Sequence, residues 1–183
     1  MRKNRGTAYG VIGLGRFGTA LAIALAQAGK EVIAIDRSEE KIKNLSDEEL
    51  NDFYQTCLIP KYYPNVVAEL KDKKNDGYLV YICSASIEGY LRFCDLPVDG
   101  ILGTKTEVIG GKYTSRMIGN NCKNEEKITR LTAVIAKLGV EIDYENSYAY
   151  SDSMHDIPML KMVKNRIRIN KKNGEMTPFI IEE

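Results

Sequence analysis

Residues 148–160 have the sequence YAYSDSMHDIPML, which predicts a buried strand followed directly by a helix. The first three residues form an apolar, aromatic run, and Pro158 is typical of the first turn of a helix. Asp152 and Asp156 lie in the turn between them, four residues apart, where their carboxylates can face one Mg²⁺ ion. The alternative is a capped helix, with Asp152 as its N-cap and no metal.

The composition is that of an ordinary globular domain. The chain has 183 residues, with 26 basic and 25 acidic side chains and a formal net charge of +1. This length predicts a single domain over residues 1–183, and the balanced charge argues against nucleic acid or a membrane as partner. Four cysteines and one histidine form no zinc-type cluster, so we expect reduced thiols and a cytoplasmic protein. We expect no signal peptide or membrane span.

The N-terminal residues carry a dinucleotide-binding pattern. A strand at residues 8–12 is followed by GLGRFG at 13–18, a small-residue helix, a strand at 31–35 and then Asp36. In such a unit the glycines let a pyrophosphate approach the helix N-terminus, and the acid accepts hydrogen bonds from a ribose. The pattern predicts binding of a mononucleotide or dinucleotide, unless the motif serves only packing. The residues expected to bind the nucleotide are Gly13, Gly15, Arg16, Gly18 and Asp36.

This segment, residues 1–43, resembles the N-terminal half of the regulatory K⁺-conductance (RCK) domains of bacterial potassium transporters, on the residues GLGRFG and EVIAIDRSEEKI. The resemblance implies binding of NAD or an adenine nucleotide. It stops after Asp36, because residues 38–56 predict a helix with a capping box formed by Ser46 and Glu49 instead of the next strand and its acid.

The remainder, residues 44–183, resembles haloacid-dehalogenase-like (HAD) phosphatases of the phosphoserine-phosphatase type. Three motifs occur in the family's order: the strand YLVYI ending in CSAS, the segment GKYTSRMIGNNCKNEEKITRL, and YAYSDSMHDIPML. The resemblance implies that Ser84 binds the phosphoryl group, that Lys127 steadies its charge, and that Asp152 and Asp156 hold Mg²⁺; Ser84, Lys127 and Asp152 are the catalytic candidates. The simpler alternatives are a helix N-cap for Ser84 and a solvated helix face for Lys127.

The first motif of these phosphatases is missing from the sequence. They attack phosphorus with the first aspartate of a DxDxT sequence, and no DxDxT occurs in this chain. The nearest substitute is Asp36-Arg37-Ser38, where Ser38 stands in place of the second aspartate. The resemblance therefore implies a phosphatase body that lacks its usual nucleophile.

The pattern of strands and helices predicts an α/β fold. We expect one three-layer α/β/α sandwich around a mostly parallel, Rossmann-like sheet of about six strands in the order 4-3-2-1-5-6, with a small hairpin insertion at 107–118. The basic run at 161–172 predicts a charged edge strand at 166–170, with a phosphate-binding surface as the alternative. Along the sheet, the expected strands are residues 100–104, 78–82, 31–35, 8–12, 148–150 and 166–170.

This strand order separates the phosphatase groups. Asp36 would lie two strands from Asp152, about 10 Å at roughly 4.8 Å per strand, and Ser84 would lie three strands away. We therefore predict an engineered or chimeric Rossmann-like protein, joined near Lys43, with no phosphatase activity and with nucleotide binding at the glycine loop.

The alternative function is a Mg²⁺-dependent HAD-type phosphatase of small phosphomonoesters. It would use five residues along the chain: Asp36, Ser84, Lys127, Asp152 and Asp156. In either case incomplete units expose strand edges, which makes a homodimer a further hypothesis.

Overall fold

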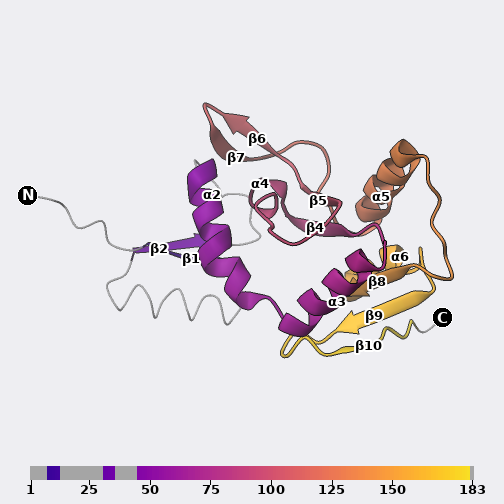
Figure 1. Cartoon of the computed structure of the whole chain (residues 1–183). Coiled ribbons are helices and arrows are strands. Elements are labelled where there is room, and N and C mark those ends of the chain that lie inside the picture. The colour runs from indigo at the N-terminus through magenta and orange to yellow at the C-terminus, as the bar shows by residue number, and fades with distance from the viewer. Residues whose placement is uncertain (1–7, 13–30, 36–44, 182–183) are drawn as a thin grey trace, which may run out of the picture. The chain divides into compact units, whose positions relative to one another are not determined.

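The structure, a computed structural model, describes residues 8–12, 31–35 and 45–181, with side chains from residue 45 onward (Figure 1). The chain divides into two compact units. Unit 1 comprises Met1–Pro60 and Thr106–Met117, and unit 2 comprises Lys61–Lys105 and Ile118–Glu183.

Unit 1 contains a parallel strand pair at the positions that the sequence predicts. β1 (Ala8–Ile12) pairs with β2 (Glu31–Ile35) in continuous register, from Ala8 opposite Glu31 to Ile12 opposite Ile35. The nucleotide-binding candidates Gly13, Gly15, Arg16, Gly18 and Asp36 all lie outside the described residues.

A second, antiparallel sheet of unit 1 has the order β3-β7-β6. It consists of β3 (Leu45–Ser46), β6 (Thr106–Ile109) and β7 (Lys112–Met117). Between β6 and β7, Gly110 and Gly111 have φ angles of +58° and +75°, which a two-residue hairpin turn of this kind requires and glycine adopts without strain. The predicted hairpin is confirmed.

The helix α2 (Asp47–Phe53) begins at the predicted capping box. Ser46 Oγ accepts a hydrogen bond from the Glu49 N–H at 3.3 Å, and the Ser46 N–H donates to Glu49 Oε2 at 2.7 Å. The two residues before the helix form β3 instead of the expected helical turn. Beyond α2 the chain winds into a π-helical turn, η2 (Tyr54–Leu58), and a 3₁₀ turn, η3 (Ile59–Lys61). Among the side chains that the structure describes in this unit, Leu50, Phe53, Tyr54 and Tyr113 are buried.

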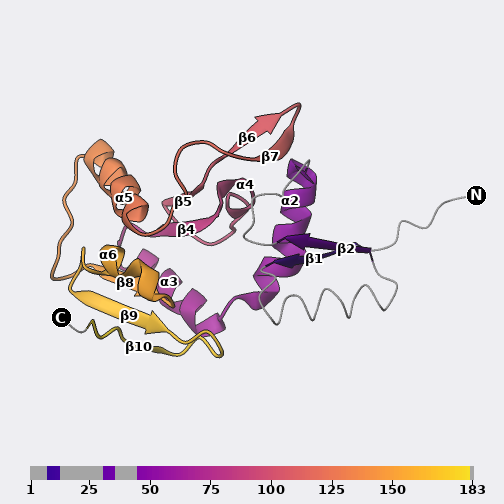
Figure 2. The same cartoon turned by 180° about the vertical axis from the view of Figure 1, so that it is seen from behind.

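Unit 2 contains two small sheets (Figure 2). In the first, β4 (Tyr81–Ile87) and β5 (Gly100–Thr104) are parallel. The second has the order β10-β9-β8: β8 (Tyr148–Ser151) and β9 (Asn165–Ile169) are parallel, and β10 (Met176–Pro178) is antiparallel to β9.

The predicted six-strand order is therefore not confirmed, although the fold is mixed α/β. Three neighbour relations that it required are present, β5 with β4, β2 with β1, and β8 with β9, but in the described residues each belongs to a separate sheet. The strand near residues 166–170 is also not an edge strand, because β10 covers its outer side. A tight turn returns the chain: the Gly174 N–H donates to the Asn170 carbonyl at 2.8 Å, and Gly174 has a φ of +73°.

Helix α3 (Pro64–Asn75) is attached at its start to the turn between β9 and β10. Tyr63 Oη donates to the Lys171 carbonyl and Asn65 Nδ2 to the Gly174 carbonyl, both at 2.6 Å. Midway along the helix, Glu69 Oε1 accepts from Tyr150 Oη of β8 at 2.6 Å. Burial and this carboxylate both raise the pKa of Tyr150.

The other helices of unit 2 are α4 (Glu88–Leu91), α5 (Glu125–Leu138) and α6 (Ile157–Leu160), with a 3₁₀ turn, η4 (Met154–Asp156), before α6. α5 ends at Gly139, which has the left-handed conformation common after a helix. In the described ranges, no helix combines the length and the apolar character needed to cross a membrane.

A cavity of about 680 Å³ lies in unit 2 and is lined mostly by apolar side chains from β4, β8, α3, α5 and the α6 region. Val163, which lines the cavity, is 6% exposed, and Leu160, which follows the lining residue Met159, is completely buried. Residues that line the cavity include Val66, Leu70, Val80, Leu131, Val134 and Met159.

We predict that Leu160→Ala lowers the free energy of unfolding by about 2–5 kcal/mol, because it removes a fully buried side chain and leaves a void. The matched control is Ile180→Ala, since Ile180 is 80% exposed and its truncation should change stability by less than about 0.5 kcal/mol. Urea unfolding of both variants tests this. If both variants lose the same free energy of unfolding, Leu160 is not part of the core.

Candidate active site

The candidate site is built around Lys127, in the first turn of α5. Its residue exposure is only 6%, although lysine is almost never buried without a partner. The partner is Asp156 of η4, whose Oδ1 accepts a hydrogen bond from Lys127 Nζ at 2.6 Å. The two side chains are 8% and 14% exposed. The interpretation of Lys127 as a solvated helix residue is therefore wrong.

The second oxygen of Asp156 is also bound. Ser151, buried at the end of β8, donates from Oγ to Asp156 Oδ2 at 2.7 Å. Ser151 Oγ in turn accepts from the Ser153 N–H at 3.0 Å, and Ser153 Oγ caps η4 by accepting from the His155 N–H at 3.2 Å. The carboxylate is thus fixed by a charged donor and a neutral one, a strong combination in a buried setting.

The other predicted metal ligand, Asp152, lies in a different environment. Its side chain is 51% exposed, and its Oδ2 is 3.8 Å from Lys171 Nζ, an exposed and weak ion pair. Asp152 is therefore a carboxylate with oxygens open to solvent, whereas both oxygens of Asp156 have protein partners. In the described part of the chain, no three acidic, histidine or cysteine side chains cluster as a metal site.

Ser84 lies within β4, close to the carboxyl end of its parallel ladder with β5. Its Oγ accepts a hydrogen bond from the Ser86 N–H at 3.1 Å. It does not cap a helix, because α4 begins only at Glu88 and has Ile87 at its N-cap. The preceding residue, Cys83, is close enough to the ion pair for the charges of Lys127 and Asp156 to act in opposite directions on its pKa.

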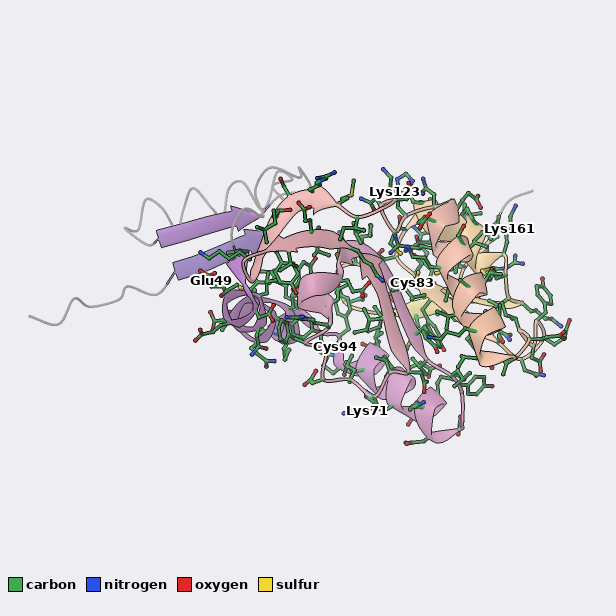
Figure 3. The ribbon with its side chains drawn as sticks, turned by 90° about the horizontal axis from the view of Figure 1, so that it is seen from above. Glu49, Lys71, Cys83, Cys94, Lys123 and Lys161 are labelled. Atoms are coloured by element: carbon green, nitrogen blue, oxygen red, sulfur yellow. The ribbon has the colours of Figure 1, made fainter. Side chains whose placement is uncertain are left out.

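Two further groups connect β4 and β5 to α5 and to the segment before it. Thr104, at the end of β5, donates from Oγ1 to the Ala85 carbonyl at 2.8 Å and accepts from the Cys122 N–H at 3.0 Å. Arg130 of α5 binds the Gly103 carbonyl, and its Nη2 donates to the Asn120 carbonyl at 2.7 Å. Figure 3 labels one residue in each of two of these segments, Cys83 on β4 and Lys123 just before α5.

The sequence motifs assign no role to Ser151, Thr104 or Arg130. A signal existed for Ser151, because it is the first hydroxyl residue after an apolar strand and lies next to an acid. Arg130 has one local partner, the Glu126 carboxylate four residues before it on α5. The backbone carbonyls that Thr104 and Arg130 bind, Ala85 and Gly103, are distant in sequence and give no local signal.

In comparison with known proteins, the family model of haloacid dehalogenase-like hydrolases matches residues 8–161 of the chain. A histidinol-phosphatase of Neisseria meningitidis is 31% identical over 133 residues, which are 68% of this chain and 60% of that protein. A phosphoserine phosphatase of Mycobacterium tuberculosis is 32% identical over 75 residues, which are 41% of this chain and 24% of that protein. The chain thus spans less than two thirds of these relatives.

Solved structures share the fold. A protein of unknown function from Bordetella pertussis superposes with a TM-score of 0.58 at 18% identity, covering 90% of each chain. A probable phosphoserine phosphatase from Vibrio cholerae superposes with a TM-score of 0.58 at 17% identity, covering 87% of this chain and 55% of that one. At these identities the likeness concerns the fold alone.

The family match corrects the interpretation of the chain as a chimera. It begins at the first residue of β1 and runs through residue 43, where the sequence analysis placed a junction. Nothing in the comparisons supports an RCK domain or nucleotide binding, so both expectations are withdrawn.

We predict that Ser151→Ala lowers the free energy of unfolding by about 1.5–3 kcal/mol, because it removes a hydrogen bond to the charged Asp156. Ser147→Ala, a change of the same size just before β8, should alter stability by less than about 0.5 kcal/mol. Urea unfolding at neutral pH compares the two. If they unfold at the same midpoint, Ser151 does not stabilise the carboxylate.

Proposed function

The chain belongs to the haloacid dehalogenase-like hydrolase family, and from this we propose that it is a Mg²⁺-dependent phosphatase of small phosphomonoesters. The observation that carries the proposal is the buried ion pair between Lys127 and Asp156. The names of two relatives, a histidinol-phosphatase and a phosphoserine phosphatase, support the reaction class.

The family match and the named relatives also contradict the expectation of an engineered scaffold without phosphatase activity. It rested on the missing DxDxT sequence and on a junction near residue 43. The family match crosses that position, and the relatives include a histidinol-phosphatase and a phosphoserine phosphatase. The alternative from the sequence, a phosphatase, is therefore the function to test.

Lys127 and Ser84 would bind the phosphoryl group. Lys127 carries a positive charge on an ammonium whose position is fixed by Asp156, and a fixed charge stabilises a phosphoryl transition state without reorganising. Ser84 has a hydroxyl that accepts from the Ser86 N–H, so its own proton remains available for a phosphoryl oxygen. Asp156 acts on Lys127 and is a positioning residue in this scheme.

Asp152 fits the metal role better than Asp156 does. Its exposed carboxylate, with only a distant lysine beside it, is a hard oxygen ligand of the kind that Mg²⁺ prefers. Asp156 has both oxygens engaged by Lys127 and Ser151. When bound, Mg²⁺ would screen the negative charges of the phosphate and of the attacking carboxylate.

We assign the nucleophile to Asp36, the acid that directly follows β2 in the sequence. Its carboxylate oxygen would form a bond to phosphorus as the ester oxygen leaves, and water would then hydrolyse the aspartyl phosphate. Asp36 lies outside the described residues, so this assignment rests on the sequence: an acid after a strand, in the N-terminal part of the family match.

The full chain should hydrolyse p-nitrophenyl phosphate in the presence of Mg²⁺. Asp36→Asn and Asp152→Asn should each lower kcat/KM at least about 100-fold, the scale expected when a charged group at the reacting centre is removed. Asp72→Asn is the matched control, because Asp72 is an exposed acid of α3, and it should retain full activity. Phosphoserine and histidinol phosphate, assayed by phosphate release, would then rank the natural substrate classes.

Three outcomes would count against the proposal or a part of it. No hydrolysis by the unaltered chain rejects the phosphatase. Unchanged activity of Asp36→Asn rejects Asp36 as nucleophile and leaves the other roles standing. Unchanged Mg²⁺ dependence of Asp152→Asn rejects Asp152 as the metal ligand.

A further inference from the structure

Two cysteine side chains distant in sequence are in contact beside the candidate site. The sulfur atoms of Cys83, on β4, and Cys122, before α5, are 3.7 Å apart, and 39 positions separate the two residues. Cys83 is partly buried and Cys122 is fully buried. The other two cysteines contact hydroxyl groups: Cys94 lies 4.0 Å from Tyr62 Oη, and Cys57 lies 3.6 Å from Thr56 Oγ1.

The backbone around Cys122 holds its sulfur against β4 and β5. The Cys122 N–H donates to Thr104 Oγ1 at 3.0 Å, and its Sγ is 3.3 Å from the carbonyl oxygen of Leu102. Leu102 is the β5 residue that lies opposite Cys83 in the parallel ladder. Cys122 therefore packs onto the sheet at the level of Cys83, so the contact follows from the fold and not from two loose side chains.

We propose that Cys83 and Cys122 form a reversible disulfide when the protein meets a peroxide. A disulfide bond is about 2.05 Å long, so the sulfurs must approach each other by about 1.7 Å. Small rotations of the two cysteine side chains supply such a movement. Of the two residues, Cys83 is the one that is partly exposed.

The electron and proton balance is complete with hydrogen peroxide as oxidant. The sulfur that ionises first attacks one peroxide oxygen, the O–O bond breaks, and a sulfenic acid and hydroxide form. The second sulfur attacks the sulfenic sulfur, the S–O bond breaks, and a second hydroxide leaves. The two thiol protons convert the hydroxides to water, so two thiols and one peroxide give one disulfide and two water molecules.

The surroundings favour a thiolate in this pair. The pKa of Cys122 is lowered to about 7, first by the hydrogen bond from Cys83 and also by the positive charges of Arg130 and Lys127. The pKa of Cys83 is raised, chiefly by the same hydrogen bond and by burial. One shared negative charge near neutral pH provides the nucleophile that oxidation needs.

The disulfide would connect two segments that carry candidate site residues. Cys83 directly precedes Ser84, and Cys122 lies five residues before Lys127. Oxidation would thus covalently fix β4 to the segment that leads into α5. The formation of the bond is measured by mass and thiol content, so the inference stands or falls independently of phosphatase activity.

The full chain, reduced and freed of reductant, should be treated with hydrogen peroxide at neutral pH and digested without reduction. We expect titratable thiols to fall from four to two per chain, the intact mass to fall by about 2 Da, and dithiothreitol to reverse both changes. Trypsin should release one linked species, residues 75–92 joined to residues 117–123.

Cysteine variants test whether the disulfide forms between Cys83 and Cys122 and not with the other two thiols. Cys94→Ser is the matched control and should still form the link, with its thiols falling from three to one. Cys83→Ser and Cys122→Ser should each retain three thiols under peroxide treatment that oxidises the unaltered chain. Linkage of Cys57 or Cys94 in comparable yield, or four remaining thiols in the unaltered chain, would overturn the proposal.

Discussion

The burial of the Lys127 ammonium is the constraint on which the candidate site depends. A lysine at 6% exposure must have a charged or strongly polar partner, because desolvating an unpaired ammonium costs several kcal/mol. Asp156 meets this need, and Ser151 completes the bonding of its carboxylate. One buried charge thus fixes the start of α5 to the turn that follows β8. Ser84 and Asp152, to which we assign phosphate and metal binding, and the thiol pair of Cys83 and Cys122 belong to the same unit as this contact.

Local sequence signals predicted the elements of this fold well. Runs of apolar residues, glycine pairs and helix caps are patterns that involve only a few neighbouring residues. The strands β1, β2 and β5 and the hairpin β6–β7, which such patterns predict, are therefore present in the structure. The capping box of Ser46 and Glu49 is also present. At the site, the resemblance selected both members of the Lys127–Asp156 ion pair, although it gave Asp156 a metal role.

Long-range features could not be predicted in the same way. The position of β9 between β8 and β10 depends on a turn at Gly174 and on hydrogen bonds from the start of α3. The role of Ser151, and the contact of Cys83 with Cys122, arise only when segments distant in sequence meet. The chimera interpretation failed for a related reason: a glycine-rich turn after a strand is a local pattern, and a local pattern does not identify the family of the whole chain.

The most direct test of the central contact is a double-mutant cycle on Lys127→Met and Asp156→Asn, measured by urea unfolding. The account predicts a coupling free energy of about 1–3 kcal/mol, as for residues in contact, because each single substitution leaves a buried group without its partner. The exposed pair of Lys164 and Glu145 provides the comparison and should couple by less than about 1 kcal/mol. A coupling between Lys127 and Asp156 no larger than that of the exposed pair would contradict the account.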